Sequence, residues 1–315
     1  IILGGMTSSS LEGTAGDDSI EINGSVTKSS INGMGGNDTL IVDGRFGGST
    51  IDGGEGNDSL AVGGGKGGAV ITSSVLGGAG DDSIDIGHAL TSSTLDAGAG
   101  DDSITLVNST DSSVALGVGN DTLFASGDLL NSSVTGDGGN NWISLDGNIT
   151  SSGVTAAANG DTILIGGNVS SSTVTGGAGD DVLQLTAATG SIALSSVDMG
   201  DGDDSVLFSG NVSGSTIGLG LGNDTLAVTG NIENGTVETG VATVQKTSVI
   251  TLGEGDNYAS IGGSVTSASI TGGDGADTIL IGDDLISSSV SLGEGDNSVN
   301  IDDDVTSSTI TAGDG

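Results

Sequence analysis

The sequence predicts an all-β fold, a single parallel β-solenoid with about 20 residues per coil, and three observations support this. Glycine accounts for 62 of the 315 residues, roughly three times its usual share in proteins. A glycine-rich pattern with one aspartate recurs in fourteen copies, mostly 20 residues apart. Alternating aliphatic residues follow the copies, which is typical of half-buried strands. One such unit cannot close a core alone, so neighbouring units must stack and share one.

The clearest copy, GGAGDDSID at 77–85, reads G-G-x-G-x-D-x-U-x, where U is a large aliphatic residue. We number its positions one to nine and call the residue at position six the motif Asp. Three copies have asparagine there instead: Asn141, Asn257 and Asn297. The other eleven have aspartate: Asp18, Asp38, Asp58, Asp82, Asp102, Asp121, Asp161, Asp181, Asp204, Asp224 and Asp277.

The first six positions predict a tight turn. Position four is glycine in thirteen copies and asparagine in one, Asn159. Asparagine is the residue other than glycine that best tolerates a left-handed backbone, so this exception also favours a turn.

A strand is predicted after each turn, with a pair of inward aliphatic residues such as Ile84 and Ile86. Two further inward sites follow, such as Leu90 and Leu95, on either side of a run of serine and threonine. Each coil is therefore expected to have four inward aliphatic residues, one acidic turn and one solvated Ser/Thr side. Phe46 and Phe208 fall in inward columns and are expected in the core.

The whole chain, 1–315, is predicted to be one solenoid segment of a longer repeat chain, right-handed by the rule for parallel connections. Three insertions interrupt the period, near 63–68, 187–190 and 229–249. The third adds thirteen residues and is the best candidate for a seam, bulge or protruding loop.

The charge of the chain restricts its partners. The 42 acidic and 4 basic residues give a formal net charge of −38. Nucleic acid is excluded as a partner, because phosphate contacts need lysine and arginine. No membrane insertion is expected either, because no apolar run is long enough to span a bilayer.

The sequence does not predict an enzyme or any catalytic residue. Acid–base catalysis needs one distinctive pair of carboxyl groups in a cleft, whereas the motif Asp residues are near-equivalent members of a column. His88 is the only histidine, and we expect it on the surface. The basic residues Lys28, Arg45, Lys66 and Lys246 are too scattered to support a lyase acting on acidic sugars.

Calcium is the expected cofactor. Ca²⁺ prefers six to eight oxygen ligands, and a glycine-rich turn exposes backbone carbonyl groups beside the carboxylate of the motif Asp. Consecutive coils lie about 4.8 Å apart, so two turns can share an ion. We therefore predict several ions in one row between successive coils, bound by the eleven motif Asp residues. The sites at Asn141, Asn257 and Asn297 should be weaker or empty.

These turns resemble the nonapeptide of the repeats-in-toxin (RTX) family. The best matches are GGEGNDSLA at 53, GGAGDDSID at 77, GGAGDDVLQ at 176 and GGDGADTIL at 272. The resemblance implies a calcium-binding parallel β-helix. RTX β-rolls have the nonapeptide on both edges of an 18-residue coil, but here only one edge has it. The layout is closer to the one-sided calcium solenoids of large bacterial adhesins and surface-layer proteins, one of which binds ice.

The resemblance implies an extracellular structural protein: a calcium-stabilised rod of a bacterial surface layer, sheath, filament or giant adhesin that self-associates end to end or laterally. The alternative is the calcium-dependent repeat region of a secreted RTX toxin or enzyme whose activity lies elsewhere. The similar ice-binding module uses a regular threonine array on its calcium turns. Position three here holds residues such as Glu55, Ala79 and Val118, so that array is absent. Trp142 and Tyr258 share an outward column in coils that lack the motif Asp, which leaves lateral contact or chance exposure open.

Overall fold

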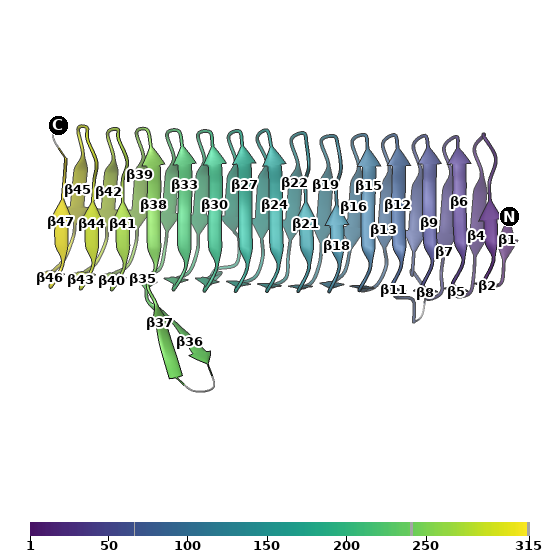
Figure 1. Ribbon diagram of the computed structural model, residues 1–315, viewed down its shortest axis with the longest axis horizontal. Coiled ribbons are helices and arrows are strands. Elements are labelled where there is room, and N and C mark those ends of the chain that lie inside the picture. Colours follow the sequence, from purple (N-terminus) through teal and green to yellow (C-terminus); the bar gives the residue numbers. More distant parts are fainter. Residues whose placement is uncertain (66, 240–241, 314–315) are drawn as a thin grey trace. The chain divides into compact units, whose positions relative to one another are not determined.

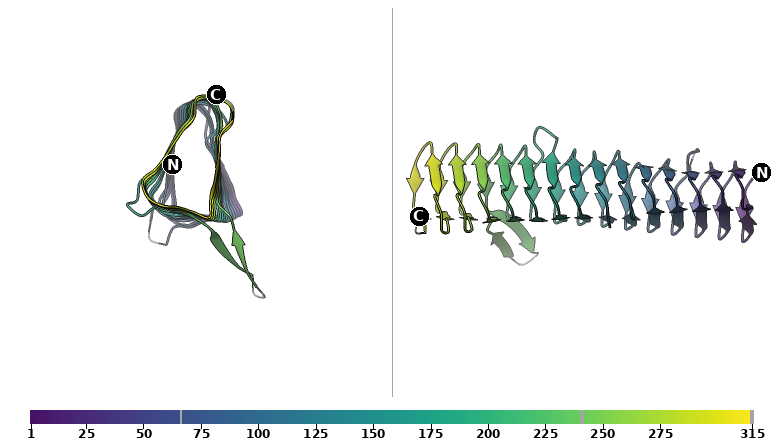
Figure 2. Two further views of the ribbon diagram at one scale, coloured as in Figure 1. Left: turned by 90° about the vertical axis from the view of Figure 1, so that its left-hand side faces the viewer. Right: turned by 90° about the horizontal axis from the view of Figure 1, so that it is seen from above.

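The computed structural model describes residues 1–65, 67–239 and 242–313, so Lys66, Gly240, Val241, Asp314 and Gly315 lie outside the described part. The described residues form strands, turns and bends without a helix. All strands except β36 (Gly235–Thr239) and β37 (Ala242–Lys246) belong to three parallel sheets of a β-solenoid (Figure 1), which confirms the predicted fold class. Each complete coil gives one strand to each sheet and is triangular when seen end-on (Figure 2). The chain forms two compact units, Ile1–Gly147 with Ser152–Ala157, and Asn148–Ser151 with Ala158–Gly315.

In unit 1, every sheet is built from strands of successive coils. Sheet A has the order β1 (Ile2–Leu3), β4 (Ser19–Ile22), β7 (Thr39–Val42), β10 (Ser59–Val62), β13 (Ser83–Ile86), β16 (Ser103–Leu106), β19 (Thr122–Ala125), β22 (Trp142–Leu145). Sheet B has the order β2 (Met6–Thr7), β5 (Val26–Thr27), β8 (Phe46–Gly47), β11 (Val70–Ile71), β14 (Leu90–Thr91), β17 (Ser109–Thr110), β20 (Leu129–Leu130). Sheet C has the order β3 (Ser10–Glu12), β6 (Ser30–Gly35), β9 (Thr50–Glu55), β12 (Ser74–Ala79), β15 (Thr94–Ala99), β18 (Ser113–Ala115), β21 (Ser133–Thr135), β24 (Gly153–Ala158).

Unit 2 repeats this arrangement. Its sheet A strands are β25 (Thr162–Ile165), β28 (Val182–Leu185), β31 (Ser205–Phe208), β34 (Thr225–Val228), β39 (Tyr258–Ile261), β42 (Thr278–Ile281), β45 (Ser298–Ile301). Its sheet B strands are β23 (Ile149–Thr150), β26 (Val169–Ser170), β29 (Ile192–Ala193), β32 (Val212–Ser213), β35 (Ile232–Glu233), β40 (Val265–Thr266), β43 (Leu285–Ile286), β46 (Val305–Thr306). Its sheet C strands are β27 (Thr173–Ala178), β30 (Ser196–Asp201), β33 (Thr216–Leu221), β38 (Val249–Glu254), β41 (Ser269–Thr271), β44 (Ser289–Ser291), β47 (Thr309–Thr311).

The strands pair in the register that the repeat predicts, and the aliphatic columns form the core. Strand β10 pairs with β13 so that Leu60 lies beside Ile84. Ile84, Ile86, Leu90 and Leu95 are all at most 1% exposed, as expected for the four inward sites. Phe46 and Phe208 are fully buried, which confirms their predicted place in the core.

A fifth inward position was missed. Position one of the motif is glycine in the clearest copies, so its role as a core position is not visible there. In other copies it holds a buried aliphatic residue: Ala97, Leu116, Ala156, Met199, Leu219, Leu252 and Leu292.

The Ser/Thr side is only partly solvated, contrary to the prediction, because one serine per coil is buried in most coils. Ser93 is 4% exposed, and its hydroxyl oxygen accepts the backbone N–H of Ser73 at 3.1 Å and donates to the carbonyl of Thr91 at 2.7 Å. The preceding residue, Ser92, has φ +48°, a left-handed conformation that turns the chain at this corner. The buried serines therefore form a hydrogen-bonded column between coils.

We expect Ser93→Ala to destabilise the protein by about 1–3 kcal/mol, because it leaves the buried N–H of Ser73 without its acceptor. The matched control is Ser92→Gly, which changes an exposed neighbour at a φ that glycine adopts freely. Thermal denaturation followed by circular dichroism measures both variants. An unchanged melting temperature in Ser93→Ala would mean that the serine column contributes nothing to stability.

The insertions leave the coils in register. The first lies between β10 and β11, and the second lies between β28 and β29. The third forms the antiparallel hairpin of β36 (Gly235–Thr239) and β37 (Ala242–Lys246), which projects from the coils of unit 2 (Figures 1 and 2). Strand β34 still pairs with β39 across the third insertion. The predicted protruding loop is thus a hairpin. No helix that could cross a membrane occurs among the described residues.

Candidate metal centre

The acidic turns connect sheet C to sheet A, and glycine is required to build them. In the turn that follows β12, Gly78 and Gly80 both have φ +122°. A Cβ atom on Gly78 would collide with the carbonyl oxygen of Gly54 in the preceding coil. The turns can therefore stack closely only because these positions have no side chain.

The motif Asp side chains form a hydrogen-bonded ladder beneath the turns. The backbone N–H of Asp58 donates to Oδ1 of Asp82 at 2.7 Å, and the N–H of Asp82 donates to Oδ1 of Asp102 at 2.7 Å. The side chains of Asp82 and Asp102 are each 2% exposed. In unit 1 the ladder comprises Asp18, Asp38, Asp58, Asp82, Asp102, Asp121 and Asn141. In unit 2 it comprises Asp161, Asp181, Asp204, Asp224, Asn257, Asp277 and Asn297.

Asp18 departs from this pattern. It is only half-buried, and its Oδ2 accepts hydrogen bonds from the backbone N–H of Thr14 at 2.6 Å and from the hydroxyl of Thr14 at 3.0 Å. Threonine replaces glycine at position two of this copy, so the local turn supplies partners that the other turns do not.

The second carboxylate oxygen of the buried aspartates is the notable feature of the ladder. In nine of them Oδ2 is buried and has no hydrogen-bond partner among the described residues: Asp38, Asp58, Asp82, Asp102, Asp121, Asp181, Asp204, Asp224 and Asp277. Buried charged groups are normally paired, hydrogen-bonded or bound to a metal. A whole column of such oxygens is therefore a candidate ligand-binding site.

The electrostatic cost of this arrangement appears in the acidity of the carboxyl groups. Burial is the largest cause of a raised pKa in Asp102 and Asp204, and neighbouring carboxylates also raise it. A hydrogen bond from a backbone N–H lowers it in part, and the resulting pKa of both residues is about 7. Burial likewise raises the pKa of Asp82, Asp121 and Asp181 to about 6. Without a cation, these five side chains therefore keep their protons up to a higher pH than an ordinary aspartate does.

A carboxylate oxygen and a carbonyl oxygen from adjacent coils come close together in three of these turns. The Cβ position of Gly33, Gly53 or Gly77, at position one, lies against Oδ2 of its own motif Asp and against the position-one carbonyl oxygen of the next coil. Carboxylate and carbonyl oxygens are the ligands that Ca²⁺ prefers. The chemistry of the predicted ligands and of the turn carbonyls therefore fits calcium.

The asparagine copies place a hydrogen-bond donor where the aspartates have Oδ2. Nδ2 of Asn257 donates to the carbonyl of Gly255 at 3.1 Å, to that of Gly253 at 3.4 Å and to Oδ1 of Asp277 at 3.0 Å. Nδ2 of Asn297 donates to the carbonyl of Gly293 at 3.0 Å. The Nδ2 atoms of both residues thus face the carbonyl oxygens of their own turns.

A second ladder, which sequence reasoning missed, runs outside the first. It uses position five, where the N–H of Asp101 donates to Oδ1 of Asp81 at 2.9 Å and the N–H of Asn120 donates to Oδ1 of Asp101 at 2.7 Å. These side chains are exposed. The recurrence of Asp or Asn at position five was the available signal. In the Asp81–Asp82 pair, therefore, one carboxylate belongs to each ladder.

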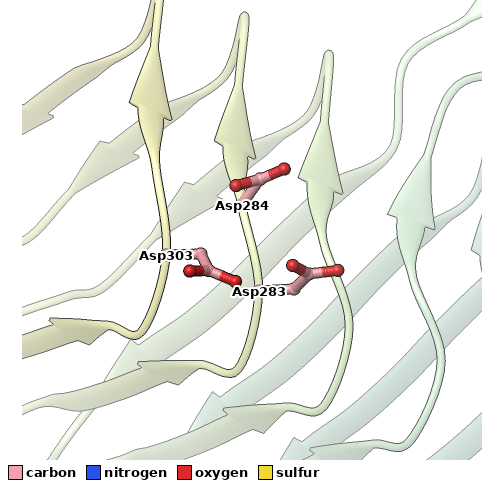
Figure 3. A group of neighbouring side chains, drawn as sticks. All are labelled: Asp283, Asp284 and Asp303. Atoms are coloured by element: carbon pink, nitrogen blue, oxygen red, sulfur yellow. The ribbon is translucent and has the colours of Figure 1, made fainter.

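An acidic cluster lies apart from both ladders, at the corner between sheets A and B. Carboxylate oxygens of Asp283, Asp284 and Asp303 lie within 4.8 Å of one another (Figure 3). Oδ2 of Asp283 accepts a hydrogen bond from the hydroxyl of Ser264 at 2.9 Å. Asp283 and Asp303 are exposed, unlike the motif Asp residues, and solvated carboxylates need no ion. We do not assign a metal to this cluster.

Five other residues singled out in the sequence lie on the surface: Lys28, Arg45, His88, Trp142 and Tyr258. His88 is exposed, with Nε2 at 3.1 Å from the carbonyl oxygen of Gly65 in the first insertion. Trp142 and Tyr258 are 49% and 42% exposed, which confirms the outward direction of their column. Lys28 and Arg45 line a groove of about 230 Å³ on the outside of sheet B.

Comparison with known proteins finds similarity to solved structures. No family model and no curated protein matches the sequence. The chain is similar to the X-ray crystal structure of a hyperactive, Ca²⁺-dependent, β-helical antifreeze protein from an Antarctic bacterium. The two share 21% identity and a TM-score of 0.59, over 93% of this chain and 83% of the other. At this identity the similarity establishes that the two chains share the β-helical fold.

Proposed function

We propose that the chain is a calcium-stabilised structural solenoid in which Ca²⁺ ions bind in rows along the acidic turns. The buried Oδ2 atoms without partners carry this proposal. Two carboxylates about 5 Å apart repel each other by roughly 0.8 kcal/mol in water, and by more where the dielectric constant is lower. A divalent ion between adjacent turns converts this repulsion into a crosslink. The Ca²⁺ dependence of a protein with the same fold agrees with this assignment.

Each ion would be held by oxygens of this chain alone. The ligands are Oδ2 of a motif Asp and backbone carbonyl oxygens of the turns in two adjacent coils. The bound ion would supply positive charge and would join the coils. Because most aspartate coils would use equivalent oxygens, metal binding and coil stacking become one process.

We place this solenoid outside the cell, as part of a bacterial surface layer, sheath, filament or giant adhesin. The coils are nearly alike and no coil has a distinctive pair of catalytic groups, which favours a structural role over an enzyme. Ca²⁺ sites of extracellular modules typically have dissociation constants of about 10⁻⁴–10⁻³ M, which suits such a location. Open solenoid ends expose unpaired strand edges, which favours self-association. Electron microscopy of the native assembly tests this role, and monodisperse single chains at high calcium would contradict self-association.

The alternative is the calcium-dependent repeat region of a secreted RTX toxin or enzyme whose activity lies elsewhere. A catalytic domain in the full-length gene would favour it. An antifreeze role like that of the similar protein gains no support from the turns, because position three has no regular threonine column.

Calcium binding is tested by equilibrium dialysis with elemental analysis. We expect several ions per chain in the wild type, and about one fewer in Asp102→Asn, because this change removes a buried Oδ2. The matched control is Asp101→Asn, which removes the same charge from the exposed neighbouring residue and should leave the number of ions unchanged. A chain that binds no calcium, or equal losses in the two variants, would contradict the proposed site.

A further inference from the structure

The three asparagines that replace the motif Asp direct an amide nitrogen toward the proposed row of ions. Nδ2 of Asn257 lies 3.0–3.4 Å from three oxygens: two carbonyls of its own turn and Oδ1 of Asp277 in the next coil. An amide NH₂ group has only two hydrogens to donate. Three oxygens therefore converge on one partly positive group, as ligands converge on a cation.

The orientation of this amide is fixed by the ladder. Oδ1 of Asn257 accepts the backbone N–H of Asp224 at 2.9 Å, which is the role that Oδ1 has in nine of the aspartate copies. Nδ2 therefore points in the direction that Oδ2 has in the aspartate copies. There, a carboxylate oxygen faces the turn carbonyls, and these lone pairs repel unless a cation lies between them.

The other two asparagines show the same direction. Nδ2 of Asn297 donates to the carbonyl of Gly293 at 3.0 Å, and Nδ2 of Asn141 points toward the carbonyl of Gly139 at 3.5 Å. A Cβ atom on Gly136, at position one, would lie 2.7 Å from Nδ2 of Asn141. In the aspartate copies, the corresponding Cβ position lies against Oδ2. The amide nitrogen thus takes the place of Oδ2 beside the predicted ion site.

We propose that the amide groups of Asn141, Asn257 and Asn297 replace calcium, so that the carbonyl oxygens of these turns are satisfied without a metal ion. The inference rests on the proposed calcium row and adds the positions at which that row is interrupted. In unit 1 the aspartates end at Asn141. In unit 2, Asn257 separates Asp161–Asp224 from Asp277, and Asn297 follows Asp277. The ions would consequently occupy separate segments rather than one continuous row.

The hairpin insertion agrees with this assignment. Strands β36 and β37 lie in the stretch that leads to the Asn257 turn, so this coil has the longest insertion in the described chain. Strand β39, directly after Asn257, still pairs with β34 on one side and β42 on the other. A coil interrupted in this way is joined here by hydrogen bonds that do not depend on calcium.

The test is Asn257→Asp, measured by equilibrium dialysis and by thermal denaturation with and without EDTA. We expect one calcium ion more per chain than in the wild type, and a lower melting temperature than the wild type in EDTA but not in calcium. Asn223→Asp is the control, because it adds the same charge to the exposed ladder one residue before a motif Asp. It should bind no additional tightly held ion.

The reverse change gives an independent test if Asn257→Asp fails to fold. Asp224→Asn should bind one ion fewer and should be at least as stable as the wild type in EDTA, because the new amide can donate to the turn carbonyls. An unchanged ion count in Asn257→Asp, or a loss of stability in EDTA for Asp224→Asn, would overturn this inference while the wild type still binds calcium. A wild type that binds no calcium would instead overturn the proposed function.

Discussion

Removing calcium with EDTA is expected to lower the melting temperature of the chain by on the order of 20 °C or more and to reduce its β-sheet circular dichroism signal. One site at a hundred times its dissociation constant contributes about 2.7 kcal/mol. One kcal/mol shifts the melting temperature of a chain of 150–250 residues by about 2–4 °C, and somewhat less in a longer one. Several sites acting on the same coils therefore give a large total shift, and added calcium should reverse it.

The controls separate ligation from simple screening of charge. Sodium chloride at equal ionic strength weakens repulsion among exposed carboxylates, but it cannot bind to the buried Oδ2 atoms. Magnesium prefers shorter distances and a stricter octahedral geometry than calcium. We expect both to restore much less stability than calcium does. A melting temperature unchanged by EDTA, or restored equally by sodium, would exclude the calcium row.

The dependence of stability on pH is expected to change sign when calcium is removed. Burial raises the pKa of Asp102 and Asp204 to about 7 in the folded chain, whereas an unfolded aspartate has a pKa of about 3.9. Between these values the folded chain binds more protons than the unfolded chain, so the free energy of unfolding falls as the pH rises. In EDTA the protein should thus be more stable at pH 5 than at pH 8.

With calcium the same groups act in the opposite direction. The ion binds the ionised carboxylates, so protons compete with it, and stability should fall as the pH drops below about 6. Melting temperatures measured from pH 4 to 8 in both buffers provide the test. Asp204→Asn should reduce the slope in EDTA more than Asp203→Asn, which removes an exposed carboxylate from the same turn. Slopes of equal sign in the two buffers would contradict the assignment.

The coil, its four aliphatic columns and its acidic turn could be predicted because the period places equivalent residues beside each other. Register follows directly, since any slip would separate Leu60 from Ile84. The buried serine could not be predicted in the same way. Ser92 and Ser93 are adjacent and chemically identical, and only the left-handed backbone at Ser92 decides that Ser93 is the one that turns inward.

The motif Asp column was predicted from the motif, but the different roles of the two carboxylate oxygens were not. Spacing alone does not reveal that Oδ1 accepts a backbone N–H while Oδ2 is left for a ligand. It also does not show that position five forms a separate exposed ladder. The departure of Asp18 depends on two donors of one residue, the backbone N–H and the hydroxyl of Thr14. These features depend on side-chain directions, which a one-dimensional pattern does not contain.

The three insertions differ from the acidic turns in a way that matters for protein design. Two insertions lie between sheets A and B, and the third lies between sheets B and C. By contrast, the motif residue follows the inward aliphatic residue of sheet C by seven positions in all fourteen copies, as Asp102 follows Leu95. Foreign peptides should therefore be grafted between sheets A and B or between sheets B and C. Between sheets B and C, the hairpin that follows Ile232–Glu233 already accommodates extra chain. A graft in the acidic turn would displace the oxygen atoms that are proposed to bind the same calcium ion.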